Sequence, residues 1–252
     1  MNTTIYYFST TGNSLTTARR IAEGLGGCEL VPVMSARQCT KLAEEDAEVG
    51  FVFPVYFSDM PYPVRDLISK MVFRENSYIF AVTTARGHSG AVNQRTDQLL
   101  RTRGQKLSLS VGINMPGNSY INEPGVDEMH LAGQDRAVSE ALKRIAARET
   151  CDYSTGELLP LRQTAWPNNF RGIEADETCT GCGLCARLCP MDNIRIENGR
   201  AVMGDDCATC LACFHWCPAE AVWMSRQENI ARRSKYHHPE IGVEDILAQK
   251  GD

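Results

Sequence analysis

The chain carries a duplicated cysteine run, Cys179-Thr-Gly-Cys182-Gly-Leu-Cys185-Ala-Arg-Leu-Cys189-Pro190 and, 28 residues further along, Cys207-Ala-Thr-Cys210-Leu-Ala-Cys213-Phe-His-Trp-Cys217-Pro218. Both copies have the spacing C-x2-C-x2-C-x3-C-P, so one is an internal repeat of the other. Eight of the eleven cysteines of the chain lie in these two copies. The repeat therefore indicates a small unit organised around thiol ligands.

The spacing of the repeat has a physical reason. Three thiolates two residues apart on a tight loop converge on three irons of one cubane, while the fourth, carried past a short helical turn, points to a neighbouring cluster. Pro190 and Pro218 end these turns because proline cannot continue a helix. Under this crossed rule one 4Fe–4S cluster takes Cys179, Cys182, Cys185 and Cys217, and the other takes Cys207, Cys210, Cys213 and Cys189.

A pair of zinc sites is the alternative for these cysteines. Zinc usually takes two C-x2-C pairs from separate hairpins or mixes in histidine, which fits two four-cysteine runs with trailing prolines poorly. His215 lies inside the second run, but four thiolates already complete each set. We therefore interpret His215 as a bystander or as a hydrogen-bond donor near a sulfur.

Segment 173–224 resembles the bacterial two-cluster ferredoxins, a small α+β fold with two 4Fe–4S clusters. The resemblance includes the connector 194–202 between the two runs, which alternates apolar and polar residues around Asn198-Gly199. This dipeptide between two alternating stretches is a strong short-range signal of a β-hairpin.

The first 150 residues alternate between strand and helix patterns. Strands are predicted at 5–8, 29–33, 49–55, 78–84 and 106–114, and helices at 15–25, 63–72, 90–103 and 127–148. Stretch 49–55 is apolar throughout, as expected for a strand buried on both faces. The alternation predicts a doubly wound five-stranded parallel sheet with right-handed crossovers and helices on both faces. A ligand of such a domain binds beyond the carboxyl ends of the strands.

The loop after the first strand reads Ser9-Thr10-Thr11-Gly12-Asn13-Ser14 and leads into a helix. Hydroxyl groups, a flexible glycine and backbone N–H groups at a helix N-terminus can hold a phosphate with help from the helix dipole. The loop contains no lysine or arginine, which suits a monophosphate, and it matches neither GxGxxG nor a Walker A sequence. An ordinary helix-capping turn is the alternative, because Ser, Thr and Asn are favoured caps.

At this loop the domain resembles the flavodoxins, whose first loop reads Ser/Thr-x-Thr-Gly-x-Ser/Thr and binds the phosphate of FMN. Ser9, Thr11, Gly12 and Ser14 match that pattern position by position. The resemblance implies that FMN is the cofactor and that two further loops hold its ring. The residues so implied are Pro54, Val55, Tyr56 and Phe57 after the third strand, and Thr83, Thr84, Ala85, Arg86, Gly87 and Gly90 after the fourth.

The roles of individual ring-loop residues stay open at this stage. Tyr56 or Phe57 can stack on the flavin, or both can be half-buried aromatics at a strand end. Arg86 can offset charge on a reduced flavin, or it can face solvent. The loop 83–90 departs from common flavodoxins because it lacks a Tyr or Trp.

Together the two parts resemble the flavodoxin–ferredoxin fusion family, whose members occur mainly in anaerobes. We expect a flavodoxin-like domain at 1–150, a connector at 151–172 that contains Trp166, a ferredoxin domain at 173–224 and a tail at 225–252. We interpret His237-His238 as part of a tail that packs on the body rather than as a metal site. Cys28, Cys39 and Cys151 are interpreted as packing residues or idle thiols.

Composition limits the class of protein and its partners. The 252 residues include 26 Lys and Arg against 31 Asp and Glu, close to the average for a globular chain. We expect no membrane span, no signal peptide and a cytoplasmic location. Residues 174–220 hold eight acidic and three basic residues, so a basic patch for nucleic acid is missing and the acidic rim either steers a redox partner protein or keeps the domain soluble. The oligomeric state is left open.

The implied function is electron transfer between two 4Fe–4S clusters and FMN, and to or from a redox partner protein. The alternative is an FMN-dependent reductase of a small acceptor such as a quinone or nitro compound, fed through the clusters. His88 and Asp59 are its only acid–base candidates near the ring loops. If the modules are separable, FMN binding should survive replacement of single cluster cysteines by serine.

Overall fold

The computed structural model describes residues 3–39, 42–118, 125–154, 173–224 and 233–251. Most of the predicted connector, including Trp166, and the first part of the predicted tail lie outside the described residues. Cys151 and Tyr153, at the start of that connector, bond to β7 and the segment before it: the Cys151 N–H donates to the Ser108 carbonyl and the Ser110 N–H donates to the Tyr153 hydroxyl.

Five parallel strands form the central sheet of the first domain. They are β1 (Thr3–Tyr7), β2 (Glu29–Pro32), β4 (Glu48–Pro54), β6 (Tyr78–Ala85) and β7 (Leu109–Asn114). Their order in the sheet is β2-β1-β4-β6-β7, and every neighbouring pair is parallel. This confirms the predicted flavodoxin-like doubly wound sheet, with the reversal of strand order next to β1.

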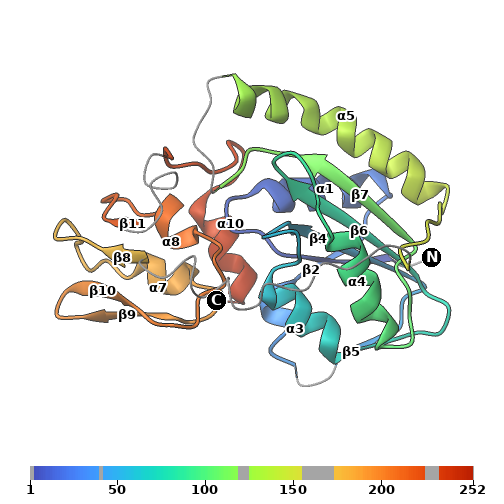
Figure 1. Cartoon of the computed structure of the whole chain (residues 1–252), viewed down its shortest axis with the longest axis horizontal. Coiled ribbons are helices and arrows are strands. Elements are labelled where there is room, and N and C mark those ends of the chain that lie inside the picture. The colour runs from blue at the N-terminus through green and yellow to red at the C-terminus, as the bar shows by residue number, and fades with distance from the viewer. Residues whose placement is uncertain (1–2, 40–41, 119–124, 155–172, 225–232, 252) are drawn as a thin grey trace.

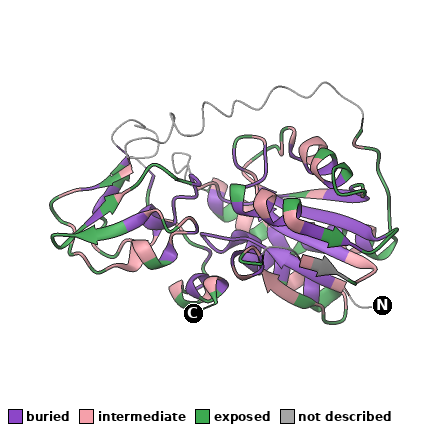
Figure 2. Cartoon of the chain, turned by 90° about the horizontal axis from the view of Figure 1, so that it is seen from below, coloured by how far each residue is buried: buried purple, intermediate pink, exposed green. Residues whose placement is uncertain are grey.

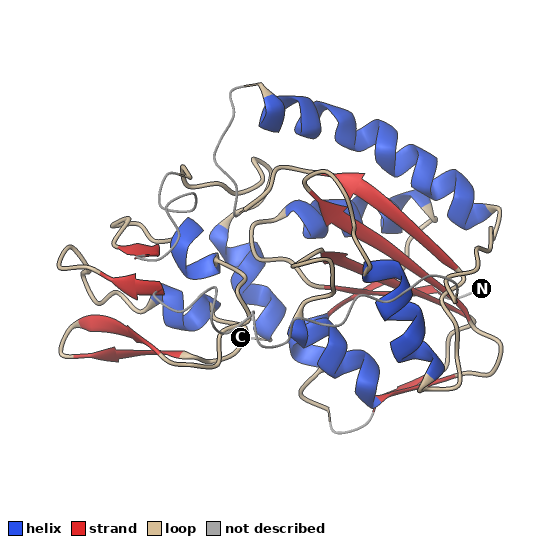
Figure 3. Cartoon of the chain, viewed as in Figure 1, coloured by secondary structure: helices blue, strands red, loops and turns tan. Residues whose placement is uncertain are grey.

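Helices cover both faces of this sheet (Figures 1 and 3). The pair α1 (Asn13–Gly24) and α5 (Val126–Ala146) lies on one face, and the pair α3 (Tyr62–Lys70) and α4 (Val92–Arg101) lies on the other. The predicted helices and strands match these elements within a few residues. Three short elements were not predicted, namely α2 (Val33–Ala36) and the parallel pair β3 (Leu42–Glu44) and β5 (Met71–Phe73). Elements of three or four residues are too short to show a periodicity.

The core of the molecule lies on the central strands (Figure 2). Phe51 and Phe53 of β4, Ile79 and Phe80 of β6, and Ile5 of β1 are fully buried. Both faces of β4 and β6 are covered by helices, so residues of either parity along these strands are apolar. This explains the uninterrupted apolar run that predicted the third strand.

The second domain consists of two hairpin-like sheets and two short helices. Strand β8 (Ile173–Ala175) pairs antiparallel with β11 (Val222–Met224), and β9 (Ile194–Glu197) pairs antiparallel with β10 (Arg200–Met203). Helices α7 (Leu184–Leu188) and α8 (Ala212–His215) lie within the two cysteine runs, each just before the fourth cysteine, and pack on each other. Asn198 and Gly199 have φ values of 51° and 76°, as a two-residue hairpin turn requires, which confirms the predicted hairpin.

The C-terminal segment 233–251 contacts both domains. It contains α10 (Val243–Leu247) and the short 3-10 helix η1 (Ala248–Lys250), and α10 lies between the domains in Figure 1. Ile246 and Leu247 belong to the core of the first domain, while the Lys250 ammonium donates to the carbonyl of Cys189 at 3.1 Å. Within the described ranges, no helix combines the length and apolar character needed to span a bilayer.

Two glycine substitutions test the packing of the sheet domain. A Cβ at Gly50 of β4 would lie 2.5 Å from the ring of Phe80, so Gly50→Ala should overpack the core and lower the free energy of unfolding by about 1–3 kcal/mol. A Cβ at Gly133 of α5 meets nothing within 4 Å, so Gly133→Ala should raise it by about 1 kcal/mol through helix propensity. Anaerobic urea denaturation measures both changes, and shifts of the same sign would contradict the described core.

Candidate functional site

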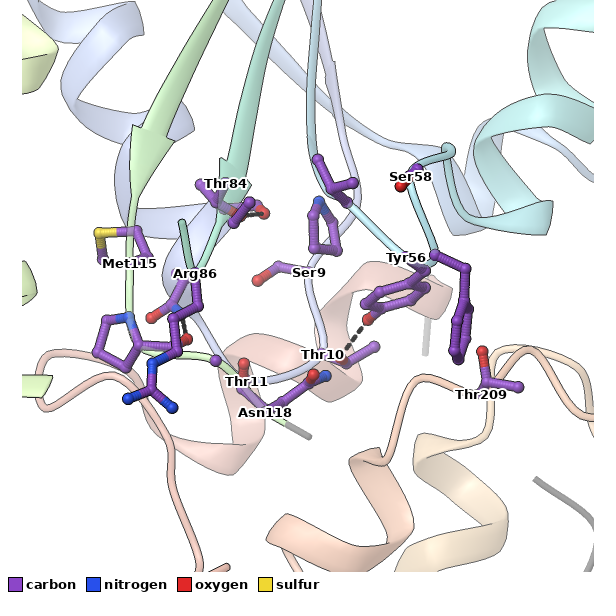
Figure 4. Close-up of a pocket in the computed structure, with 18 of the residues that line it drawn as sticks. Ser9, Thr10, Thr11, Tyr56, Ser58, Thr84, Arg86, Met115, Asn118 and Thr209 are labelled. Atoms are coloured by element: carbon purple, nitrogen blue, oxygen red, sulfur yellow. Dashed lines mark hydrogen bonds between the residues drawn. The ribbon is translucent and has the colours of Figure 1, made fainter. Parts of the chain in front are cut away.

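A pocket opens at the carboxyl ends of the parallel strands (Figure 4). Its walls come from four loops of the first domain and one loop of the second. The lining residues are Ser9, Thr10, Thr11, Asn13, Ser14, Pro54, Val55, Tyr56, Phe57, Ser58, Thr84, Ala85, Arg86, His88, Met115, Pro116, Gly117, Asn118 and Thr209. The pocket is therefore where doubly wound domains bind their ligands, next to the reversal of strand order.

The loop 9–14 is held in shape before any ligand is considered. The Gly12 N–H donates to the Ser9 Oγ at 3.1 Å, and the hydroxyls of Ser14 and Thr84 lie 2.8 Å apart. Asn13 begins α1, and its side-chain amide donates to the Pro116 carbonyl at 2.9 Å. The first N–H groups of α1 lack partners within the helix, which makes this end of the pocket suited to an anion.

The opposite wall is a tight turn at the end of β4. Tyr56 and Asp59 exchange backbone hydrogen bonds of 2.9 Å, and Phe57 and Ser58 between them have φ values of 52° and 63°. Tyr56 is buried, whereas 46% of Phe57 is exposed. The turn thus presents a phenyl ring at the pocket, and a non-glycine residue in this backbone region is uncommon enough to suggest a functional constraint.

Four predicted cofactor residues do not line the pocket. Gly12 faces the C-terminal segment instead: its φ is 97°, and a Cβ there would lie 2.9 Å from both His238 and Ile241. Thr83 is buried within β6, and Gly87 and Gly90 lie on the exposed side of their loop. The other predicted residues of all three loops are lining residues. Gly12 is required here by its positive φ and by the close approach of the tail.

The pocket also has residues that sequence reasoning did not assign to it. Ser58 and the segment 115–118 follow strands β4 and β7, so their place at this sheet edge was a signal that could have included them. Thr209 had no such signal, because it lies in the second cysteine run and reaches the pocket only through domain packing.

The cysteines of the first crossed set gather around a second, smaller cavity. Cys179, Cys182, Cys185 and Cys217 all line it, together with apolar residues of the hairpins such as Ile196 and Val222. Cys182 is exposed, and the other three are half-buried. We call this group the distal set, because the loop 179–185, which carries three of its cysteines, contributes no residue to the lining of the first pocket.

Cys189, Cys207 and Cys213 lie near Cys210, close enough to interact electrostatically with its thiol. We call these four the proximal set. Cys210 and Cys213 are buried, and burial raises the pKa of both thiols because it disfavours the charged thiolate. Backbone N–H groups of Asn193 and Thr209 lie 3.4 and 3.3 Å from the sulfurs of Cys189 and Cys207.

The proximal set is joined directly to the loop 9–14, which we call the phosphate loop because its groups suit a phosphate. The Thr10 hydroxyl donates to the Cys210 carbonyl at 3.1 Å and accepts from the Tyr56 hydroxyl at 3.1 Å. The Trp216 indole N–H donates to the Thr10 carbonyl at 2.7 Å, and the Asn118 amide donates to the same Cys210 carbonyl at 3.1 Å. These contacts make the two domains one continuous structure at this point.

His215 bridges the tail and the loop after β7 instead of facing a sulfur. Its Nδ1 accepts from the Tyr236 N–H at 3.0 Å, so its Nε2 carries the proton donated to the Asn118 carbonyl at 2.9 Å. Burial is the main cause that lowers the pKa of His215 to about 3, so the ring is neutral. His215 in the second run therefore helps to hold the iron–sulfur domain against the tail and the loop after β7.

The two acid–base candidates are not brought together. Asp59 is fully buried outside the pocket lining, where its carboxylate accepts from the Met60 N–H and pairs with Arg65 and Arg95. Burial raises the pKa of Asp59, and the two arginines oppose that rise. His88 lines the pocket but is exposed. The geometry therefore offers no acid–base pair among the described lining residues.

The C-terminal segment 233–251 packs against the phosphate loop and bonds to its backbone and side chains. Gln249 makes two hydrogen bonds with the backbone of Ser9, accepting from its N–H at 3.1 Å and donating to its carbonyl at 2.8 Å. The His238 N–H donates to the Thr11 carbonyl at 2.7 Å, and Tyr236 donates its hydroxyl proton to the Asn13 side chain at 2.6 Å. The ring of His237 stacks on Trp216 with the ring centres 4.4 Å apart.

Fold and site define a fusion of a flavodoxin-like domain with a ferredoxin-type iron–sulfur domain. Residues 171–218 match the family described as 4Fe-4S dicluster domain. This match decides between the cluster and zinc interpretations of the cysteine runs. No curated protein matches the chain.

Solved structures resemble the first domain only distantly. A flavodoxin from Streptococcus pneumoniae TIGR4 is 14% identical over 56% of this chain and 99% of its own, with a TM-score of 0.35. An NAD(P)H:quinone oxidoreductase from Methanothermobacter marburgensis is 12% identical over 58% of this chain and 97% of its own, with a TM-score of 0.38. The topology of the domain is defined by its own strand order, given above.

Replacing Gln249 should weaken the support of the phosphate loop. Gln249→Leu leaves the buried N–H and carbonyl of Ser9 without partners, so the free energy of unfolding should fall by about 1–3 kcal/mol. Thermal denaturation under anaerobic conditions measures the change. Gln38→Leu, at an exposed glutamine, is the matched control and should leave the melting temperature near the wild-type value. Equal melting temperatures for the two variants would contradict this role.

Protonation of His238 should destabilise the tail. Its Nδ1 accepts from the Glu240 N–H and its Nε2 donates to the side-chain amide oxygen of Gln134, so the folded state needs the neutral ring. Burial lowers its pKa below the ordinary 6.5. The unfolded chain therefore binds the proton more readily, and this contribution to stability is present above pH 6.5 and is lost as the pH falls below it.

The test is the free energy of unfolding between about pH 8 and pH 5.5, the window in which an ordinary histidine titrates. Wild type should lose stability toward low pH more steeply than His238→Gln. The exposed His88→Gln variant is the control and should follow wild type. A wild-type slope equal to that of His238→Gln would show that His238 is not the titrating group.

Proposed function

We propose that this protein is an electron carrier that passes electrons between two 4Fe–4S clusters and FMN, and to or from a redox partner protein. The observation that carries the proposal is the shared wall of the two sites. Thr10 of the phosphate loop bonds to the Cys210 carbonyl, and Thr209, next to that cysteine, lines the pocket. A cluster held by the proximal set and a flavin held by the pocket would therefore be neighbours.

The pocket fits FMN in its donor groups. The hydroxyls and backbone N–H groups of the loop 9–14, at the start of α1, suit a phosphate. Tyr56, Phe57 and Val55 offer apolar contact to a ring system, and Arg86 adds a positive charge to the lining. Thr84 joins the two regions through its contact with Ser14.

The two cysteine sets fit two clusters. Each set supplies four thiols from both runs, with the fourth cysteine of each run joining the other run's set, in agreement with the crossed rule. Cys185 of the distal set is close enough to Cys213 of the proximal set to affect its thiol electrostatically. Backbone N–H groups beside the sulfurs of Cys189 and Cys207 would tune the proximal potential.

The arrangement of the two cysteine sets and the pocket suggests an order of electron transfer. Bound clusters exchange one electron at a time and a bound flavin exchanges one or two. Each set has one exposed cysteine, Cys182 in the distal set and Cys207 in the proximal set, but the distal set has no buried cysteine and is the more open side for a partner. The proximal set, with buried Cys210 and Cys213, is the one that is bonded to the pocket through Thr10. The electrons would therefore pass from partner to distal set, proximal set and flavin, or in the reverse direction.

Direct reduction of a small acceptor at the flavin is less well supported. Such a reaction calls for an acid–base group at the ring, and among the described lining residues His88 alone has a side chain that ordinarily titrates near neutral pH. Asp59 is committed to Arg65 and Arg95. The pocket thus has donors for binding but no paired catalytic groups.

Anaerobic purification and reconstitution test the proposal. The chain should hold about eight iron atoms and one FMN, with cluster signals by electron paramagnetic resonance. In stopped-flow mixing with a reduced one-electron carrier protein, Cys182→Ser should slow the loss of flavin absorbance at least about tenfold, because the distal entry point is removed. Cys39→Ser, at an exposed cysteine outside both sets, is the control and should react like wild type.

Three outcomes would contradict the carrier function. The first is a preparation that binds neither FMN nor iron. The second is flavin reduction at equal rates in wild type and Cys182→Ser. The third is rapid steady-state turnover of a quinone or nitro compound without a protein partner, which would favour the reductase instead.

A further inference from the structure

Thr209 combines three unusual properties. It lies between Cys207 and Cys210 in the second cysteine run, yet it lines the pocket of the first domain. It is only 3% exposed, and its hydroxyl has no hydrogen-bond partner among the residues that the structure describes. Figure 4 shows it on the same side of the pocket as Tyr56 and Ser58, across from Arg86 and Met115. A buried hydroxyl normally has a partner, so this one is an unused donor in a residue of the pocket wall.

The backbone of Thr209 is also strained. Its φ is 57°, in the left-handed region that β-branched residues rarely adopt. The internal repeat places Gly181 at the equivalent position of the first run, with a φ of 65°. The turn between these cysteines therefore demands a positive φ, and glycine meets it without strain in the first copy. A threonine kept at the same position in the second copy indicates that its side chain has a use.

The position of Thr209 depends on the residues that flank it. Its N–H lies 3.3 Å from the Cys207 sulfur, and the carbonyl of the next residue, Cys210, accepts from Thr10 and Asn118 of the pocket. The loop is thus tied to its thiols on one side and to the pocket on the other. The first run has a different environment, because a Cβ at Gly181 would lie 2.4 Å from the Gly199 carbonyl oxygen of the β9–β10 hairpin.

We propose that the loop 207–210 is a flavin-binding element as well as a cluster-binding element, so that flavin affinity depends on the metal held by the proximal set. This inference rests on the proposed FMN site. Thr209 supplies a hydroxyl donor from the iron–sulfur domain to the flavin. The proximal thiolates, once bound to metal, keep the loop in the conformation that presents this hydroxyl. The loop 179–185, which carries three of the distal cysteines, has no residue in the pocket lining, so the distal set should not influence flavin affinity.

Side-chain variants of Thr209 test the hydroxyl while all eight cluster cysteines stay in place. Thr209→Val keeps the shape and should raise the Kd for FMN about five- to tenfold through one lost hydrogen bond. Thr209→Ser keeps the hydroxyl and should bind FMN nearly as wild type. Thr209→Gly restores the residue of the first repeat, so it should bind FMN as weakly as Thr209→Val while holding its iron at least as firmly as wild type. Fluorescence titration of flavin-free protein gives each Kd, and iron analysis monitors the clusters.

Cysteine variants test the dependence on the proximal set. Cys207→Ser should weaken FMN binding by at least as much as Thr209→Val, whereas Cys182→Ser of the distal set should leave the Kd close to the wild-type value. Equal wild-type affinities in Thr209→Val and Thr209→Ser, or in Cys207→Ser, would overturn the inference although the carrier function would stand. Failure of wild type itself to bind FMN would instead refute the flavin site.

Discussion

The carbonyl oxygen of Cys210 accepts two hydrogen bonds from the first domain, one from the Thr10 hydroxyl and one from the Asn118 amide. These bonds tie a cysteine of the proximal set to the loop that suits a phosphate. Trp216 adds a third bond at the same place through the Thr10 carbonyl. A backbone carbonyl buried at a domain boundary needs such partners, and here they also determine how close the two redox sites can be.

The C-terminal segment completes this junction from the other side. Gln249 satisfies both backbone groups of Ser9, and His238 approaches Gly12 so closely that no side chain fits there. Gly12 of the phosphate loop is therefore required for two reasons: the turn needs a positive φ, and the tail leaves no space for a side chain. The loop, the tail and the second cysteine run form one packed unit, which differs from the picture of two separable modules that the sequence suggested. Under the proposal made above, flavin binding and assembly of the proximal cluster are linked properties.

Much of the fold and part of the site could be predicted because the signals are local. The strand and helix alternation of residues 1–150 predicted the parallel sheet, and most residues of the three predicted loops line the pocket. The assignments that did not reach the pocket, such as Thr83 and Gly87, concern which way a residue faces at a strand end. Side chains alternate between the two faces of a strand, so a shift of one residue at the strand end turns a side chain toward the pocket or away from it.

The sequence by itself determined the ligand inventory of this protein. Thiol spacing within a run is a property of a dozen consecutive residues, so the first three cysteines of each set follow from local geometry, and the crossed rule predicts the fourth. Only the tertiary structure decided that the second cysteine run packs against the pocket, that Thr209 lines the pocket and that Gln249 holds the backbone of Ser9 in its wall. Ser9 and Gln249 are 240 residues apart in the chain, and no local pattern reports a contact of that separation. Such contacts form because a buried backbone N–H or carbonyl, here that of Ser9, needs a hydrogen-bond partner, and folding brings one from a distant part of the chain.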